Sequence, residues 1–323
     1  MPTAVLDVYL TSSEAETALR ADARSGLTSI PKVLPPKWFY DATGSELFER
    51  ITTLPEYYPF AAEREILRAK AARIAEVSRA EALVELGSGS SEKTRLLLDA
   101  LETGGTLHSY LPLDVSESAL REAMDSLAVE YPTLALHGIV GDFTRHLGQL
   151  PAQGKRLLAF LGGTIGNLLP AEREAFLHTA RAALRPGEQL LLGTGLVISP
   201  SVMVPAYDDA LGVTAEFNRN VLRVFNRELG ADFDVEAFSH VALWNAEREW
   251  IEMRLRARRS MIVRVAELGI EVPFAHDEEI RTETSAKFRR HGVRGELAAA
   301  GFELTEWWTD SAQRFALSLA TAR

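Results

Sequence analysis

One short segment near residue 90 limits what this chain can fold into more than any other. An apolar run at 83–86 ends in Gly87-Ser88-Gly89, and a segment with helical character follows at 92–101. A strand, a tight turn and a helix N-terminus in this order are typical of the nucleotide-binding corner of a parallel sheet. The segment therefore predicts an α/β fold.

The residue at position 92 narrows the choice of nucleotide. A dinucleotide-binding motif has a third glycine there, where the backbone packs closely beneath a pyrophosphate. This chain has Glu92, whose bulky, anionic side chain would repel a phosphate. A ligand that contains adenosine but no phosphate fits better, and S-adenosylmethionine (SAM) is the common one.

Composition excludes several classes of function. The 323 residues include no cysteine, which rules out disulfides, thiolate metal sites and cysteine nucleophiles. The seven histidines lack metal-ligand spacing, so we expect no structural metal. A net charge of −10 offers no basic surface to nucleic acid. Without a signal peptide or a membrane-spanning run, we expect a cytoplasmic monomer with no membrane or nucleic-acid partner.

Apolar and helical segments alternate through the middle of the chain. Alternation at this pitch predicts a parallel sheet with helices on both faces, and ligands bind at the carboxyl ends of such strands. The strand-like runs are 83–86, 108–114, 134–140, 156–161 and 188–193, and the helical ones are 92–101, 116–130 and 170–184.

Two acids follow strands of this sheet. Asp114 closes the second strand, where an acid can accept hydrogen bonds from two ribose hydroxyls. Asp142 follows the third, and with Phe143 it offers an acceptor for the adenine amine and a ring to cover its face. Each acid has a structural alternative, because it can instead cap the helix that follows it. Their shared position at strand ends favours the cofactor-binding interpretation.

The flanks of the alternating region predict a second domain. In the segment between the sheet and its closing antiparallel pair, 251–256 alternates strictly and 263–272 is typical of a hairpin. A strand over 282–285 would point Glu283 and Ser285 the same way. We expect a mostly helical 1–60 and the insertion 197–285 to form a substrate-binding α+β domain, and 61–196 with 286–323 to form the cofactor-binding domain.

Several blocks carry a more specific resemblance. They are Pro36–Asp41, Leu54–Pro59, Glu85–Gly89, Ser91–Thr94, Thr164–Asn167, Ala206–Asp209, Gly212–Ala215, Phe217–Asn220 and Trp307–Asp310. In these blocks the chain resembles the L-histidine Nα-methyltransferase family of ergothioneine biosynthesis, from roughly residue 15 onward. The resemblance implies a Rossmann-type class I SAM-dependent methyltransferase domain with a dedicated substrate domain. It also implies trimethylation of the α-amine of free L-histidine to hercynine.

The resemblance implies which residues bind the cofactor. Lys93, near a helix N-terminus, would pair with the methionyl carboxylate, although a solvated helix lysine is the alternative. The full set is Gly87, Lys93, Asp114, Asp142 and Phe143.

The same resemblance implies a histidine site. Recognition of both ring nitrogens would explain specificity, since analogues leave buried polar groups unpaired. The alternatives are half-buried aromatic residues, a core methionine and a solvated glutamate. The set is Tyr57, Asn167 and Tyr207 for the carboxylate and amine, Glu283 and Ser285 for the ring, and Met253, Phe48 and Thr214 for the walls of its slot.

Methyl transfer requires a neutral amine, whereas an α-amino group has a pKa of roughly 8. The site must therefore accept a proton, and Tyr40, with a water, is the candidate for that relay beside Tyr57 and Asn167. Alignment of the reacting groups can supply roughly 7–11 kcal/mol. Aromatic rings around Tyr40 would tolerate the quaternary ammonium product through cation–π contacts.

Two other functions remain open. The chain can be a methyltransferase for another amino acid or for a peptide amine, and such an enzyme would not need Glu283. It can also be a binding module for histidine or SAM, and such a module would not need Tyr40.

One position differs from the family to which the resemblance points. Relatives often have Asp where this chain has Gly195, which puts contacts at the domain junction in doubt.

Overall fold

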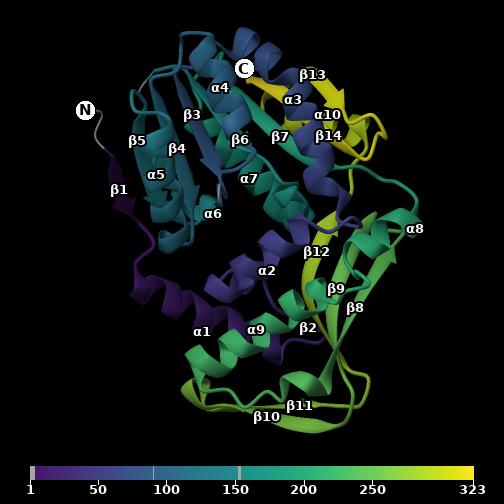
Figure 1. Ribbon diagram of the computed structural model, residues 1–323. Coiled ribbons are helices and arrows are strands. Elements are labelled where there is room, and N and C mark those ends of the chain that lie inside the picture. The colour runs from purple at the N-terminus through teal and green to yellow at the C-terminus, as the bar shows by residue number, and fades with distance from the viewer. Residues whose placement is uncertain (1–3, 90, 152–153) are drawn as a thin grey trace. The chain divides into compact units, whose positions relative to one another are not determined.

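The computed structural model describes residues 4–89, 91–151 and 154–323 (Figure 1). The chain forms two compact units. Unit 1 comprises Met1–Leu10, Pro59–Val197 and Lys287–Arg323, and unit 2 comprises Thr11–Tyr58 and Ile198–Ala286. The unit boundaries lie at 58/59, 197/198 and 286/287, and they differ by two, one and one residues from the expected 60/61, 196/197 and 285/286. The first ten residues differ, since they go with unit 1.

Unit 1 is built on one sheet, which contains eight strands within the described residues. Among these strands, β14 pairs antiparallel with both β7 and β13, and the other pairs are parallel, which confirms the predicted parallel sheet with a closing antiparallel pair. The order is β1 (Val5–Val8), β5 (Ala135–Val140), β4 (Ser109–Asp114), β3 (Ala82–Leu86), β6 (Arg156–Phe160), β7 (Gln189–Gly195), β14 (Phe315–Ala322) and β13 (Phe302–Thr309).

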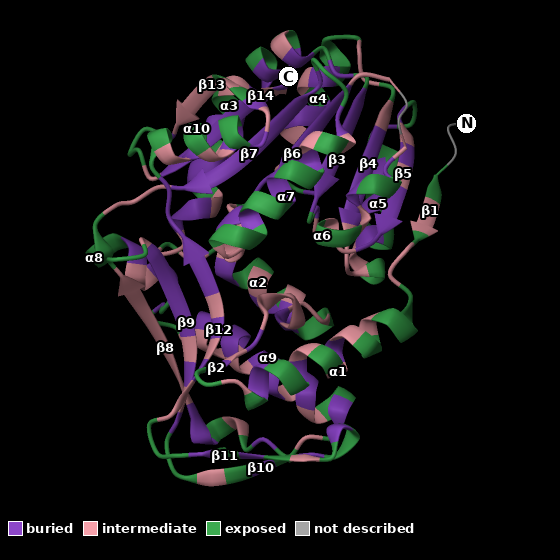
Figure 2. Cartoon of the chain, turned by 180° about the vertical axis from the view of Figure 1, so that it is seen from behind, coloured by how far each residue is buried: buried purple, intermediate pink, exposed green. Residues whose placement is uncertain are grey.

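Helices cover both faces of this sheet. One face packs against α3 (Tyr58–Ser78), α4 (Arg95–Thr103) and α5 (Glu117–Glu130). The other face meets α7 (Pro170–Ala183), where Phe176 lies 4.8 Å from Phe160 between ring centres. The central strands are therefore buried on both sides, as Figure 2 shows, and this explains their continuous apolar sequence. The short α6 (Phe143–His146) and α10 (Arg290–Ala299) complete the helices described here.

Unit 2 is a mixed α+β unit. Its larger sheet has the order β2 (Lys32–Val33), β12 (Glu279–Ala286), β9 (Trp250–Ala257) and β8 (Phe238–Asn245), and the predicted hairpin is present as β10 (Met261–Val265) and β11 (Ile270–Phe274). Its helices in the described chain are α1 (Ser12–Thr28), α2 (Ala42–Thr52), α8 (Pro200–Met203) and α9 (Val213–Leu229). The expectation that 1–60 is mostly helical missed β1 and β2.

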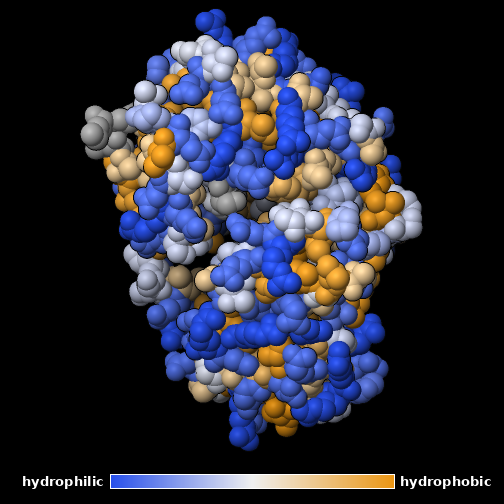
Figure 3. Space-filling model, in the orientation of Figure 1, coloured by the Kyte–Doolittle hydropathy of each residue, from blue (hydrophilic) through white to orange (hydrophobic). Residues whose placement is uncertain are grey.

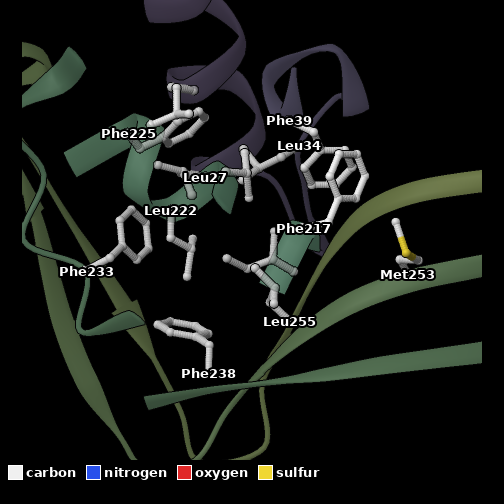
Figure 4. Packing of buried hydrophobic residues seen from close by; sticks show 14 of the residues in the cluster. Leu27, Leu34, Phe39, Phe217, Leu222, Phe225, Phe233, Phe238, Met253 and Leu255 are labelled. Atoms are coloured by element: carbon white, nitrogen blue, oxygen red, sulfur yellow. The ribbon is translucent and has the colours of Figure 1, made fainter. Parts of the chain in front are cut away.

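The core of unit 2 gathers around α9. Phe217 and Phe225 of this helix are buried, and the Phe217 ring lies 4.7 Å from that of Phe39 (Figure 4). Asn220 fixes the same region, because its Nδ2 donates to the Phe39 carbonyl at 3.1 Å and to Asp41 Oδ1 at 2.7 Å. The family-like blocks at 36–41 and 217–220 are therefore packed and bonded to each other.

The surface visible in Figure 3 is predominantly hydrophilic, with hydrophobic residues in small groups among the polar ones. In the part of the chain that the structure describes, no helix is long and apolar enough to cross a membrane. Nor do the described histidine and acidic residues form a group of three or more that could hold a metal ion.

Candidate active site

The glycine turn after β3 leaves its ligand side open. Gly87 and Gly89 have φ of +65° and +50°, and a Cβ added at either would meet nothing within 4 Å. Only glycine adopts such angles without strain, so the backbone here is free to approach a ligand. The helix that follows begins at Arg95, so the predicted start at 92 was wrong. Glu92 instead lies in the turn with a half-exposed side chain.

Glu85, for which no role was predicted from the sequence, lies buried beneath the turn. Its carboxylate accepts hydrogen bonds from Thr94 Oγ1 at 2.6 Å and Tyr110 Oη at 2.5 Å, and Ser91 Oγ lies 2.9 Å from the same phenol. Burial raises the pKa of Glu85 to about 7, although the bonds from Thr94 and Tyr110 oppose the shift. An acid inside an otherwise apolar strand was the signal for this network.

This raised pKa makes stability depend on pH. The native state holds the Glu85 proton more tightly than the unfolded chain, whose value is 4.5, so the contribution is fully present below that pH and is lost as pH rises through 7. We expect Glu85→Gln to flatten a decline of up to about 3 kcal/mol between pH 5 and 8. Urea unfolding at pH 5 and at pH 8 measures this decline in the free energy of unfolding, and Glu102→Gln, at an exposed position, is the control. Equal slopes in Glu85→Gln and the wild type would contradict the assignment.

Asp114 links two of the predicted strand ends. Its carboxylate accepts from the Gly89 N–H and the Ser116 N–H, both at 3.0 Å, and burial raises its pKa against these two bonds. The N-cap of α5 is Ser116 itself, so Asp114 is not merely a helix cap. The third strand end joins them, because the Gly141 N–H donates to the Asp114 carbonyl at 2.8 Å.

Asp142 and Phe143 follow this third strand. Asp142 caps α6, since its Oδ1 accepts from the Thr144 backbone N–H at 2.8 Å and from the Thr144 hydroxyl at 2.6 Å. The capping alternative is thus present, and it uses one carboxylate oxygen. The Phe143 ring is half-buried and lies 4.9 Å from Phe160 and 5.8 Å from Phe176. The adenine-binding role of both residues stays a prediction.

Lys93 has a partner that the sequence did not predict. Its ammonium pairs with Glu63 of α3, which is fully buried and also accepts the Gly162 N–H at 2.9 Å. The same ammonium lies 4.9 Å from the centre of the Phe60 ring, and only 15% of the side chain is exposed. Lys93 is therefore not a solvated helix lysine. Its contact with a methionyl carboxylate stays a prediction.

Asn167 lies beyond the carboxyl end of β6. It ends the turn Thr164–Asn167 and is half-buried. The chain reaches this turn through Gly162 and Gly163, whose φ values of +76° and +72° favour glycine. Unit 1 therefore carries Asn167 and all five predicted cofactor-binding residues at the carboxyl edge of its sheet.

Unit 2 brings most of the predicted substrate residues together. Tyr207 Oη lies 2.9 Å from Ser285 Oγ, and both residues are buried. The Tyr207 ring is 6.4 Å from that of Tyr57, which lies 6.2 Å from Phe48. Tyr40 packs edge-on against Phe48 at 5.6 Å. The result is an aromatic cluster with hydroxyl groups from three separate segments of chain.

Electrostatics keep two of these hydroxyls protonated. Burial raises the pKa of Tyr57 well above its usual value, and nearby Tyr207, Tyr40 and Glu283 raise it further. Burial and the charge of Glu283 likewise raise the pKa of Tyr207. Protonated phenols donate hydrogen bonds, which suits the binding of a carboxylate.

Strands β9 and β12 carry further predicted substrate residues. Met253 of β9 lies directly opposite Glu283 of β12 in the ladder, and Ser285 lies opposite Ile251. Met253 is buried, and Figure 4 shows it apart from the other labelled core residues of unit 2. Thr214 is buried in the first turn of α9. Both the core and the slot-lining interpretation of Met253 are compatible with this position.

Comparison with known proteins places the chain in a family. A family model described as histidine-specific, SAM-dependent methyltransferase matches residues 19–322. The chain belongs to this family. It is 56% identical over 97% of both chains to the histidine N-alpha-methyltransferase of Mycolicibacterium smegmatis, and 54% identical over the same shares to that of Mycobacterium tuberculosis. Ergothioneine biosynthesis protein 1 of Neurospora crassa is 29% identical over 86% of this chain and 32% of its own length.

SAM, the methyl donor of this histidine-specific methyltransferase family, fits the residues of unit 1. The open turn at Gly87 and Gly89 allows close approach, and an acid rather than a cation follows the second strand, which suits ribose hydroxyls and not a phosphate. The buried Ser88 hydroxyl in the same turn has no hydrogen-bond partner. The fold is accordingly that of a Rossmann-type class I SAM-dependent methyltransferase.

Gly195, where the family resemblance led us to expect an acid, lies beside Lys287. A Cβ added there would lie 3.3 Å from Cδ and 3.5 Å from Nζ of Lys287, which is buried. An aspartate introduced at this position would therefore approach a lysine ammonium. The difference affects a contact inside unit 1 and none of the predicted site residues.

Proposed function

We propose that this chain transfers three methyl groups from SAM to the α-amine of free L-histidine, giving hercynine, the first step of ergothioneine biosynthesis. The observation that carries the proposal is the cluster in unit 2 where Glu283 and Ser285 lie beside protonated Tyr57 and Tyr207. Membership in the histidine-specific family and the two mycobacterial relatives support it.

Glu283 and Ser285 match the two nitrogens of an imidazole. A neutral ring has one N–H donor and one acceptor nitrogen, a carboxylate only accepts, and a hydroxyl can donate. Glu283 would accept the ring N–H while Ser285, oriented by Tyr207, donates to the other nitrogen. An amino acid without this pair of groups would leave the half-buried Glu283 carboxylate without its ring donor, which is the basis of selectivity.

The remaining substrate residues act on the α-carboxylate and amine. Tyr57 donates to the carboxylate. Tyr207, whose hydrogen goes to Ser285, accepts from the amine through its hydroxyl oxygen, and Asn167 orients the amine. SAM, when bound, supplies a methyl group activated by its sulfonium charge. The predicted ring-binding residues belong to unit 2, whereas Asn167 and the predicted SAM-binding residues belong to unit 1, so turnover requires both units.

Tyr40 is proposed to relay the proton that the amine must lose. Tyr40→Phe keeps the ring that packs against Phe48 but removes the hydroxyl. We expect kcat to fall roughly 10² fold, with KM for histidine within about threefold, because proton transfer and not binding is impaired. Rates measured from pH 6 to 9 should show a shifted profile. Normal trimethylation with an unchanged pH dependence would remove Tyr40 from the mechanism.

The function is tested with a mixture of substrates. The purified protein is incubated with SAM and equimolar free amino acids, and products are followed by mass spectrometry. Trimethylated histidine as the only product supports the proposal. Methylation of another amino acid contradicts the roles of Glu283 and Ser285, and SAM binding without any product indicates a binding module or a peptide substrate.

A further inference from the structure

β12 contains a β-bulge at Thr282. Arg281 of this strand pairs with Arg254 of β9, and Glu283 pairs with Met253, so the ladder passes over Thr282. A bulge places one extra residue in one strand and leaves it out of the pairing. The extra residue, Thr282, immediately precedes Glu283, which is proposed to bind the imidazole.

The extra residue decides which face of the sheet Glu283 occupies. Side chains of a regular strand alternate, so Ile280 and Glu283 would lie on opposite faces. In the structure Ile280 lies opposite Leu255 and Glu283 opposite Met253, and these two partners are alternate residues of β9 on one face. That face carries buried core residues of unit 2. The bulge therefore turns Glu283 and, two residues later, Ser285 toward the aromatic cluster.

Asn218 of α9 holds the bulge in place. Thr282 Oγ1 lies 2.6 Å from Asn218 Oδ1 and 3.0 Å from the Met253 carbonyl, and its hydrogen is shared between them. The Asn218 amide donates to the Arg254 carbonyl at 3.0 Å. Because a carbonyl only accepts, this contact fixes which end of the amide faces Thr282. Asn218 and Thr282 are 0% and 1% exposed, so water does not compete for these bonds.

Asn218 is also linked to Tyr207 through His240. Asn218 Nδ2 donates to His240 Nδ1 at 2.8 Å, so Nε2 carries the ring hydrogen and donates to the Tyr207 carbonyl at 2.7 Å. Burial lowers the pKa of His240, which keeps the ring neutral. With the Tyr207–Ser285 contact, these bonds form a continuous chain from Tyr207 to the bulge.

We propose that Thr282 and Asn218 are positioning residues that set the specificity of this chain for imidazole. Neither contacts the substrate. The Thr282 bulge aims Glu283 at the ring, and Asn218 fixes the bulge and the Tyr207 segment in one arrangement. The inference rests on the proposed function, because it assigns the geometry of the Glu283 contact.

The test compares two substitutions at Thr282. Thr282→Val keeps the shape of the side chain and removes the hydroxyl, and Thr282→Ser retains the hydroxyl as the matched control. Calorimetric titration of histidine in the presence of S-adenosylhomocysteine should show roughly tenfold weaker binding for Thr282→Val and a change within about twofold for Thr282→Ser, since a small misplacement of a binding group is costly. Affinity for S-adenosylhomocysteine should stay within about twofold in both.

A second background separates positioning from general damage. In Glu283→Ala, adding Thr282→Val should change histidine affinity by less than about twofold, because the group through which Thr282 acts is gone. A tenfold loss in both backgrounds, no loss in either, or an equal loss of cofactor affinity would overturn the inference. An unchanged histidine affinity in Glu283→Ala alone would contradict the proposed function instead, and would remove the basis of the inference with it.

Discussion

Glu283→Ala is expected to weaken histidine binding on the order of 100-fold, because a hydrogen bond to a charged group is worth about 1.5–3 kcal/mol. Cofactor affinity should stay within about threefold, since Glu283 belongs to unit 2 and the predicted SAM residues belong to unit 1. Isothermal titrations of histidine and of S-adenosylhomocysteine give the two numbers. Their ratio distinguishes recognition of the imidazole from loss of the fold.

The matched control for this substitution is Glu271→Ala. Glu271 is an exposed glutamate on another strand of unit 2, where it pairs with Arg264, so its loss should leave both affinities unchanged. Equal losses of histidine and cofactor affinity in Glu283→Ala would refute the assignment of Glu283 to the ring. Glu283→Gln, which keeps an acceptor but not the charge, should lie between the wild type and Glu283→Ala.

The second large effect is expected from Glu63→Ala. It leaves the Lys93 ammonium without its carboxylate partner and the Gly162 N–H without its acceptor, and breaking a buried ion pair from one side costs about 3–5 kcal/mol. The lower end applies, since Lys93 is 15% exposed and can regain some water. Urea unfolding measured on the whole chain tests the loss.

Glu76→Ala on the same helix provides the comparison. Glu76 pairs with Arg73, but both side chains are at least half exposed, so the pair is worth at most about 1 kcal/mol. If Glu63→Ala were as stable as Glu76→Ala, the buried pair would contribute nothing to the fold. Glu63→Gln, which retains an acceptor for Gly162, should be less damaging than Glu63→Ala.

Much of unit 1 was predictable from its sequence. Parallel strands buried on both faces are continuous apolar runs, and those near 83, 109, 135, 156 and 189 each end at, or within two residues of, a glycine or an acid. β1 was missed because it has four residues with two exposed, and it is defined by pairing with His137–Val140 far along the chain. The Glu63–Lys93 pair was missed because it also depends on a contact between residues far apart in the sequence, and the residues around each one do not indicate its partner.

The substrate cluster was predicted by family resemblance more than by pattern. Alternation correctly put Glu283 and Ser285 on one face, but it did not reveal which face. That choice depends on the bulge, and threonine at 282 is a favourable residue in any regular strand. Asn218 belonged to a family-like block in which it had no predicted role, and its bonds to β9 and β12 depend on how α9 packs against these strands.

The place of β14 inside the sheet has a consequence for how the polypeptide is made. It lies between β7 and β13, although it begins at residue 315 and β7 has ended at residue 195. During synthesis from the N-terminus, β7 therefore exposes an unpaired apolar edge while all of the inserted part of unit 2 is being translated. Nascent chains should need protection from aggregation over this interval, and the nucleotide corner should become stable only after β14 has left the ribosome.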